Sequence, residues 1–306
     1  MPKELIRIGT RKSKLALWQA YYVQQKLQDA GWPTALVTME TKGDKVLDVS
    51  IAKIGSKGVF TEELEDKLAD GSVDIAVHSA KDMQSSLPEG FEIIAFSKRE
   101  KVEDVIVSDQ SIDLSQPLLL GTSSTRRIAT LKYFYPNVKT VEVRGNLQTR
   151  IQKMRDGLCH GLILAYAGVH RMEYDEMIKH TLSAEEFIPA VGQGSIAIES
   201  HISLHEEKKT AIRNAINDEE TWACLSAERT YLKKLEGGCS IPVFALATKY
   251  GDLVTIAGGI VSLDGKERIV KSLSGKNPTA LGDELADEVL GAGGDSILKT
   301  IKAQMK

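Results

Sequence analysis

The arginines are the residues of this 306-residue chain whose positions most clearly suggest chemistry. Six lie in or just after loops that follow predicted strands: Arg11, Arg126, Arg127, Arg144, Arg150 and Arg171. A bidentate arginine–carboxylate pair contributes about 1.5–3 kcal/mol where water is excluded, against about 0.2–1 kcal/mol for an exposed pair. Any one of these arginines alone is better explained as a solvated surface charge. Six at equivalent positions predict one site for a ligand with several carboxylates or phosphates.

Two further strand ends carry candidate groups. Asp82 could accept a hydrogen bond from a heterocyclic N–H and, when protonated, donate a proton to a leaving amine, although such an aspartate often only caps the next turn. Gly121-Thr122-Ser123-Ser124 precedes a predicted helix, so it could hold an anion at the positive end of the helix dipole. Helix capping by one of the two serines is equally consistent. Neither a Walker A motif nor GxGxxG is present, so we assign no nucleotide.

The cysteines differ in their surroundings. Cys239 follows Gly237-Gly238 in a loop between a predicted helix and a strand, where a ligand could approach the backbone and a thiolate could act as a nucleophile. Cys159 and Cys224 are interpreted as inert core residues. The three cysteines are widely spaced and lack CxxC or paired histidine spacing, so they indicate neither a disulfide framework nor a zinc site.

The elements that position these residues alternate between strands and helices. Apolar runs predict strands at residues 5–9, 35–39, 73–77, 118–120, 138–143 and 161–166. Helices are expected after Ser13, after Thr61, through Ile128 to Phe134, and over residues 147–156. The alternation predicts an α/β fold with mostly parallel sheets, in which ligands bind at the carboxyl ends of the strands.

The pattern changes beyond about residue 218. One helix is expected over residues 219–235, then three strands joined by Gly251-Asp252 and Asp264-Gly265, which are hairpin signals. Closing helices follow from Pro278. This region is predicted to be a small α+β domain with an antiparallel sheet.

Composition narrows the class of protein. The chain is 42% hydrophobic and 26% charged, which is enough for two or three globular domains. Its net charge of −3 gives no global attraction to nucleic acid. It contains no run of about 18 apolar residues and no signal-peptide pattern, so we expect a cytoplasmic protein that does not enter the membrane.

Taken together, the segments closely resemble the hydroxymethylbilane synthase (porphobilinogen deaminase) family. The matching pieces are collinear over nearly the whole chain. They are Gly9-Thr10-Arg11-Lys12-Ser13, Lys42-Gly43-Asp44, residues 52–58, His78-Ser79-Ala80-Lys81-Asp82, residues 121–127, Arg144-Gly145-Asn146, Pro189-Ala190-Val191-Gly192-Gln193-Gly194 and Leu235-Glu236-Gly237-Gly238-Cys239. Each piece alone is weak, but their joint order is specific.

The resemblance implies two periplasmic-binding-protein-like αβ domains with mostly parallel sheets and a smaller C-terminal α+β domain with a three-stranded antiparallel sheet. The expected domains are residues 1–97 with 195–217, residues 98–194, and residues 218–306. The resemblance also implies a monomer that binds porphobilinogen, joins four molecules head to tail with release of ammonia, and frees hydroxymethylbilane by hydrolysis. Its product would pass to uroporphyrinogen-III synthase.

The resemblance also implies roles for individual residues. Cys239 would bear a dipyrromethane cofactor through a thioether, and Asp82 would assist deamination and stabilise the azafulvenium cation. The six arginines would neutralise the acetate and propionate groups of the growing chain. Further binding groups would be Ser13, Ser79, Lys81, Thr122, Ser124 and Gln193, with Lys53 and Lys57 closing over the site from a lid.

Two residues near Asp82 depart from the usual family pattern. Ala80 precedes the Lys-Asp pair where Met is common, and Gln84 stands where Pro is usual. The Asp82 loop is therefore expected to be differently shaped or looser, with an effect on rate. Two other classes of protein remain as alternatives: a non-catalytic solute-binding protein for a polycarboxylate, and a thiol hydrolase that uses Cys239.

Overall fold

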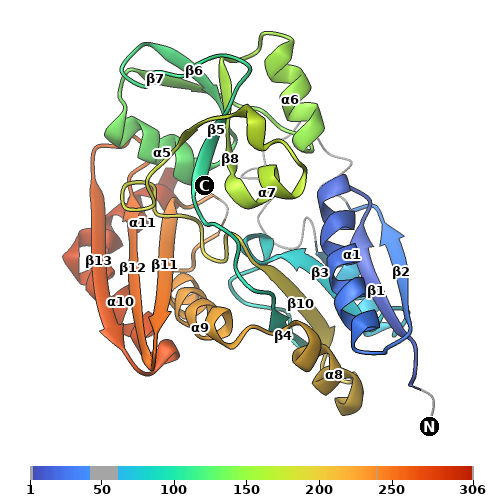
Figure 1. Ribbon diagram of the computed structural model, residues 1–306. Coiled ribbons are helices and arrows are strands. Elements are labelled where there is room, and N and C mark those ends of the chain that lie inside the picture. Colours follow the sequence, from blue (N-terminus) through green and yellow to red (C-terminus); the bar gives the residue numbers. More distant parts are fainter. Residues whose placement is uncertain (1–2, 42–60, 239, 305–306) are drawn as a thin grey trace.

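The structure is a computed structural model that describes residues 3–41, 61–238 and 240–304. Within these residues the strands form two five-stranded sheets and one three-stranded sheet, each covered by helices. Figure 1 shows the three sheets as separate groups of strands that surround the middle of the molecule.

The first sheet contains the amino-terminal strands. In spatial order these are β2 (Thr34–Met39), β1 (Ile6–Arg11), β3 (Ile75–Ser79), β10 (Ile196–His201) and β4 (Phe91–Phe96). The β1 strand is parallel to β2 and β3, whereas β10 is antiparallel to both of its neighbours, so four of these five described strands run in one direction. Its helices are α1 (Lys14–Asp29), α4 (Glu62–Ala69) and α8 (Glu206–Ile216). Ile8 and Ile75 pack with α1 and α8, while Ala76 packs with α4 on the other face, as the two-residue repeat of a strand requires.

The second sheet has the same design. In spatial order its strands are β7 (Val138–Val141), β6 (Leu118–Gly121), β8 (Gly161–Ala165), β5 (Asp104–Val107) and β9 (Ile178–Thr181). Here β5 is the antiparallel member. The helices are α5 (Thr125–Phe134), α6 (Leu147–Arg155) and α7 (Tyr166–Arg171), and a 3₁₀ turn covers Asp175–Met177. Ile163 of β8 packs with α5, whereas its neighbours Leu162 and Leu164 pack with α6 and α7.

The chain crosses between these two sheets twice. It leaves the first sheet after β4 and enters the second at β5, and it returns from β9 to β10. The crossing segments lie side by side, because Glu100 N donates to Gly194 O at 3.2 Å and Arg99 Nε donates to Gln193 O at 2.8 Å. Two hydrogen-bonded segments, rather than a single linker, therefore join the sheets.

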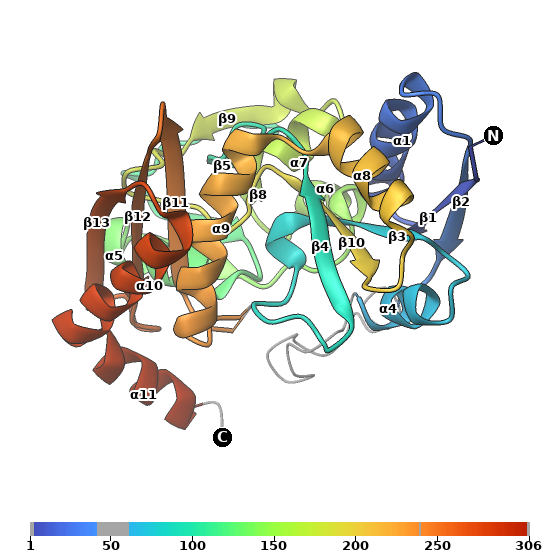
Figure 2. The ribbon, with the colours of Figure 1, turned by 90° about the horizontal axis from the view of Figure 1, so that it is seen from below.

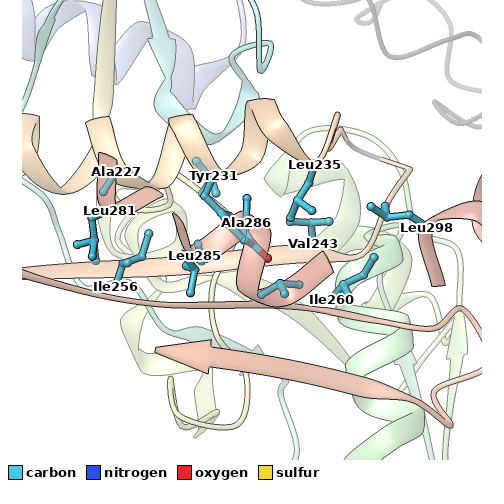
Figure 3. Packing of buried hydrophobic residues seen from close by; sticks show 14 of the residues in the cluster. Ala227, Tyr231, Leu235, Val243, Ile256, Ile260, Leu281, Leu285, Ala286 and Leu298 are labelled. Atoms are coloured by element: carbon cyan, nitrogen blue, oxygen red, sulfur yellow. The ribbon is translucent and has the colours of Figure 1, made fainter. Parts of the chain in front are cut away.

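The third sheet is antiparallel throughout. Its strands are β11 (Val243–Tyr250), β12 (Leu253–Val261) and β13 (Arg268–Gly275). The helices are α9 (Glu219–Lys234), α10 (Pro278–Val289) and α11 (Asp295–Gln304), with a π turn over Leu290–Gly294. Figure 3 shows Tyr231 of α9 and Leu285 of α10 packed over Ile256 of the sheet. Figure 2 shows α9 between β11 and β4, so this helix connects the third sheet to the first.

The predicted fold class is confirmed, with two mostly parallel sheets and a smaller antiparallel one. Ser13 caps α1 by accepting from Ala16 N, as expected. The capping prediction for Thr61 was wrong, because its hydroxyl makes no capping bond and accepts from Gln84 Nε2 instead. The sequence analysis did not identify β4, β5, β9, β10, α7 and α8.

Candidate active site

Asp82 lies in a 3₁₀ turn, Ala80–Asp82, directly after β3. The turn rests on the segment that returns from the second sheet, because Ala80 N donates to Ser195 O at 3.0 Å. Gly192 makes this contact possible: its φ is +77°, and a Cβ there would lie 2.8 Å from the carbonyl carbon of Ala80. Asp82 itself is exposed, so its carboxylate is accessible to a ligand.

The corresponding loop of the second sheet follows β6. Thr122 Oγ1 accepts from Ser124 N at 3.2 Å, and Ser124 Oγ caps α5 by accepting from Arg127 N at 3.4 Å. Ser123 Oγ donates to Val143 O at 2.9 Å. The hydroxyls therefore shape the start of α5, which is the capping alternative that the sequence left open. The amino-terminal end of α5 still lies at the carboxyl edge of the sheet.

Arg126 and Arg127 converge on one buried carboxylate, Asp104. Arg126 Nη2 donates to Asp104 Oδ2 at 2.6 Å, Arg127 donates to Oδ1 through Nε at 3.1 Å and Nη2 at 2.8 Å, and Gln193 Nε2 donates to Oδ1 at 2.9 Å. Burial alone would raise the pKa of Asp104, but the two guanidinium groups and the hydrogen bonds outweigh it and hold this pKa far below its usual range. Much of the hydrogen-bonding capacity of this arginine pair is therefore directed at Asp104.

Lys81 and Arg150 are cations whose pKa values burial lowers and which, unlike Arg126 and Arg127, form no ion pair with a buried carboxylate of the described residues. Burial lowers the pKa of Lys81 to about 8, and the positive charge of Arg127 lowers it too, whereas Asp82 opposes the change. Burial also lowers the pKa of Arg150 to about 10, again with a lowering effect of Arg127 and a raising effect of Asp82. Lys81 Nζ donates to Gln193 Oε1 at 3.4 Å and Arg150 Nε to Gly145 O at 2.7 Å. In the described part of the chain, neither cation forms an ion pair with a carboxylate.

These mutual effects place Lys81 and Asp82 of the first sheet beside Arg127 and Arg150 of the second. Arg144 belongs to the same group, because its charge also lowers the pKa of Arg150. Among the six arginines that were predicted to converge, Arg127, Arg144 and Arg150 therefore lie near one another. The candidate site lies between the carboxyl ends of strands from both sheets.

The remaining predicted residues either have other contacts or fall outside the described chain. Arg171 donates to Gly194 O at 2.7 Å and its guanidinium lies over Trp18, so it braces the crossing segment. Ser79 accepts from Gln19 Nε2 at 2.9 Å. Arg11 ends β1 and is half-buried, and Ser13 caps the next helix. The predictions for Lys53, Lys57 and Cys239 fall outside the described residues.

The other two cysteines are core residues, as expected. Both are buried, and burial raises the pKa of the Cys159 thiol and raises that of Cys224 to about 11. A thiol with a raised pKa is protonated near neutral pH and is a poor nucleophile. Neither is placed to attach a ligand.

Comparison with known proteins identifies the family. A model described as "Porphobilinogen deaminase, dipyromethane cofactor binding domain" matches residues 6–209, and one described as "Porphobilinogen deaminase, C-terminal domain" matches residues 222–291. The chain belongs to the porphobilinogen deaminase family. Porphobilinogen deaminases named as such in Desulfosudis oleivorans and Cytophaga hutchinsonii are 55% and 53% identical, over 98% and 97% of both chains respectively. The periplasmic VFT2 domain of Bordetella pertussis BvgS is 16% identical, with a TM-score of 0.43 over 73% of this chain and 93% of that chain.

A porphobilinogen deaminase is a transferase that makes hydroxymethylbilane and uses a dipyrromethane cofactor. The residues described above fit such a group. Each pyrrole carries an acetate and a propionate. The half-buried cations Lys81 and Arg150 form no ion pair with a carboxylate among the described residues, and the nearby charge of Asp82 only partly opposes the lowering of their pKa values. Anionic substituents at these two side chains would relieve the electrostatic cost that lowers their pKa values. All the cations of the site fall within the segment that matches the cofactor-binding domain.

Two features of this chain were missed by the sequence analysis. The first is Asp104, an acidic residue at the start of an apolar strand, which is the signal that could have marked it as a buried partner for arginine. The second is Glu228, whose carboxylate accepts from Arg99 Nη1 at 2.5 Å and from Gly192 N at 2.9 Å. Arg99 and Gly192 come from the two crossing segments, so α9 holds both of them.

The described part of the chain contains no candidate metal centre and no candidate membrane-spanning helix. No group of three or more histidine, cysteine or acidic residues in it could hold a metal ion. Among the described helices, none combines the length and the apolar composition needed to cross a membrane.

Proposed function

We propose that this porphobilinogen deaminase joins four porphobilinogen molecules head to tail on a dipyrromethane primer attached to Cys239, with release of one ammonia per unit, and then frees the linear tetrapyrrole by hydrolysis. One observation carries the proposal. Lys81 and Arg150, two cations whose pKa values are lowered by burial, lie beside the accessible carboxylate of Asp82. This combination suits a ligand with several carboxylates that reacts next to an acid–base group.

When bound, the dipyrromethane would supply the terminal pyrrole carbon to which the first unit is joined, and each later unit is joined to the ring added before it. Asp82 is proposed to donate a proton to the amino group that leaves porphobilinogen, because a protonated amine is the better leaving group. As a carboxylate it then accepts hydrogen bonds from pyrrole N–H groups and stabilises the positive charge left on the ring system. Formation of the new carbon–carbon bond releases one ring proton, which returns Asp82 to its starting state.

The cations are proposed to bind the acetate and propionate groups. Lys81 and Arg150 offer N–H donors near Asp82, with Arg144 beside them, and Arg127 adds positive potential. Arg11, Arg126, Arg171, Ser13, Ser79, Thr122, Ser124 and Gln193, together with Lys53 and Lys57, remain proposed contributors on the basis of the family resemblance. Cys239 is proposed as the attachment point, because the thiols of Cys159 and Cys224 are buried with raised pKa values.

The same resemblance supports three further proposals. The domains are residues 1–97 with 195–217, residues 98–194 and residues 218–306, each of which contains one of the sheets. The enzyme acts as a cytoplasmic monomer. Its product passes to uroporphyrinogen-III synthase.

The test combines intact-protein mass with turnover. Purified enzyme should exceed its chain mass by one dipyrromethane, Cys239→Ala should remove the increment, and Cys159→Ala, as the matched control, should keep it. Asp82→Asn should keep the added mass and lose most of its turnover, by a factor of about 10²–10⁴ if it is the acid–base group. An active enzyme of unmodified mass would contradict the covalent primer, and near-normal turnover of Asp82→Asn would remove Asp82 from the reaction.

A further inference from the structure

The turn that carries Asp82 is followed by a residue with an unusual set of contacts. Gln84 Nε2 donates to Thr61 Oγ1 at 3.1 Å and to Glu65 Oε1 at 3.2 Å. The backbone carbonyl of Gln84 accepts from Arg229 Nη2 at 2.8 Å. Thr61 and Glu65 belong to the start of α4, whereas Arg229 belongs to α9. This residue, two positions after Asp82, is therefore fixed to α4 by its side chain and to α9 by its backbone carbonyl.

The partners of Gln84 are buried, so these bonds cannot easily be replaced by water. Thr61 is 2% exposed and Glu65 is 7% exposed. Burial raises the pKa of Glu65, and the nearby charge of Glu199 raises it too. A buried carboxylate in this situation needs hydrogen-bond donors, and the loss of one leaves it with a full desolvation penalty. Gln84 supplies one of the donors.

The other side of the turn is anchored independently. Ala80 N donates to Ser195 O, and the side chain of Met83 is buried against Phe96 and Leu225. These contacts fix the chain two residues before Asp82 and one residue after it. Gln84 adds the first polar side-chain anchor beyond Asp82, which fixes the direction in which the chain leaves the turn.

We propose that Gln84 is a positioning residue for Asp82, and this rests on the catalytic role proposed for that carboxylate. By tying the end of the turn to α4, the Gln84 side chain holds the exposed Asp82 side chain within the narrow range of positions that proton transfer allows. The bond from Arg229 of α9 is accepted by the backbone carbonyl, so it does not depend on the side chain. Gln84 itself does not touch the reacting groups. Its side-chain hydrogen bonds fix the end of the turn at the position where proline is usual in the family.

The first measurement compares Gln84→Ala with Ser85→Ala, a control in the adjacent half-buried position. We expect Gln84→Ala to lower kcat about tenfold and to change KM by less than about twofold, because binding cations are untouched and only the geometry of the acid–base group is loosened. Ser85→Ala should leave both constants nearly unchanged. Thr61→Val, which removes one acceptor at almost constant volume, should lower kcat in the same direction by a smaller factor. Unchanged kcat in both Gln84→Ala and Thr61→Val would overturn the proposal.

The second measurement uses Gln84→Glu, which replaces the donor by a carboxyl group facing Glu65. The two carboxylates repel each other when both are charged, and one shared proton restores a hydrogen bond between them. The titratable and charged groups around Glu65 are His78 of β3, Glu199 of β10, Glu62 of α4 and Arg229 of α9. These groups are the same in every variant. The ratio of variant to wild-type kcat therefore reports the effect of the new pair of carboxyl groups, at position 84 and at Glu65. We expect this ratio to rise as the pH falls from about 8 to about 6 for Gln84→Glu and to stay flat for Gln84→Ala, which a general loss of structure would not produce.

The third measurement separates this proposal from the proposed function. If Gln84 acts only through Asp82, then Gln84→Ala should cause little further loss of residual turnover in an Asp82→Asn background. An equal tenfold loss in both backgrounds would show that Gln84 acts elsewhere and would overturn the inference. Normal turnover of Asp82→Asn alone would instead overturn the proposed function. The single and double variants thus give different results for the two failures.

Discussion

Lys81 provides a test of the electrostatics of the site that is independent of catalysis. Its pKa is lowered from 10.5 to about 8, chiefly by burial. At about 1.36 kcal/mol for each unit of pKa, protonated Lys81 destabilises the folded protein by about 3 kcal/mol. The unfolded chain binds this proton more tightly than the folded chain, so the penalty is fully present below about pH 8. It disappears as the pH rises from about 8 to about 10.5.

The perturbation is Lys81→Met in cofactor-free protein, for which Cys239→Ala provides the background. The free energy of unfolding is measured by urea denaturation from about pH 7 to about pH 10.5. We expect the difference between variant and parent to change by up to about 3 kcal/mol over this range, with the variant relatively most stable near pH 7. Removal of the Lys81–Gln193 bond adds a contribution that does not depend on pH, so the slope is the informative quantity. Lys139→Met, at an exposed position of β7, should give a flat difference and serves as the control.

The cofactor should change this result. In the enzyme that retains Cys239, carboxylates bound near Lys81 supply the missing negative charge and raise its pKa back towards the usual value. The pH-dependent part of the stability difference should then shrink. A flat difference in the cofactor-free protein would refute the reasoning, because it would mean that Lys81 is not electrostatically strained in the empty site.

Three further changes probe the geometry. Gly192→Ala should destabilise the protein by about 1–3 kcal/mol in urea unfolding and lower turnover, because the residue has a φ of +77° and its Cβ would press on Ala80 of the Asp82 turn. Arg126→Met should lower the free energy of unfolding by about 3–5 kcal/mol, because it breaks a buried ion pair with Asp104. A decrease of less than about 1 kcal/mol would contradict this expectation. Arg150→Met should leave stability unchanged or higher and raise KM, and a large loss of stability with normal KM would instead assign Arg150 a structural role.

The sequence predicted the scaffold of the site better than its contacts. Apolar periodicity and caps such as Ser13 are local signals, and they located β1, β3, β6 and α5 closely. The strands that were missed lack such signals. β5 is four residues long and begins with Asp104. β10 carries Glu199 near its centre, and this residue is completely buried, with His78 Nε2 of β3 lying 3.0 Å from its carboxylate. A charged residue inside a strand is only interpretable once its partner on another strand is known.

The arginines illustrate the same limit in the candidate site. Arg126, Arg127 and Arg150 all follow strand ends, so their sequence positions are equivalent. Their surroundings differ because β5, which enters from the first sheet in antiparallel direction, delivers Asp104 to two of them. That carboxylate is 22 residues from Arg126 in the chain, and no local pattern links them. Sequence alone could predict that arginines follow the strand ends, but not which of them already have a partner.

This division of the cations has a functional consequence. Arg126 and Arg127 are neutralised in part by Asp104 and held in place before any ligand arrives, so they provide fixed positive potential at little reorganisation cost. Lys81 and Arg150 form no ion pair in the described chain, and burial lowers their pKa values, although the nearby charge of Asp82 opposes the change. Anionic groups that bind beside Asp82 would gain the most binding free energy at Lys81 and Arg150. They would form hydrogen bonds there and also remove the electrostatic cost of two half-buried positive charges. A site built in this way binds carboxylates most strongly at the point where the proposed acid–base group can reach the atoms that react.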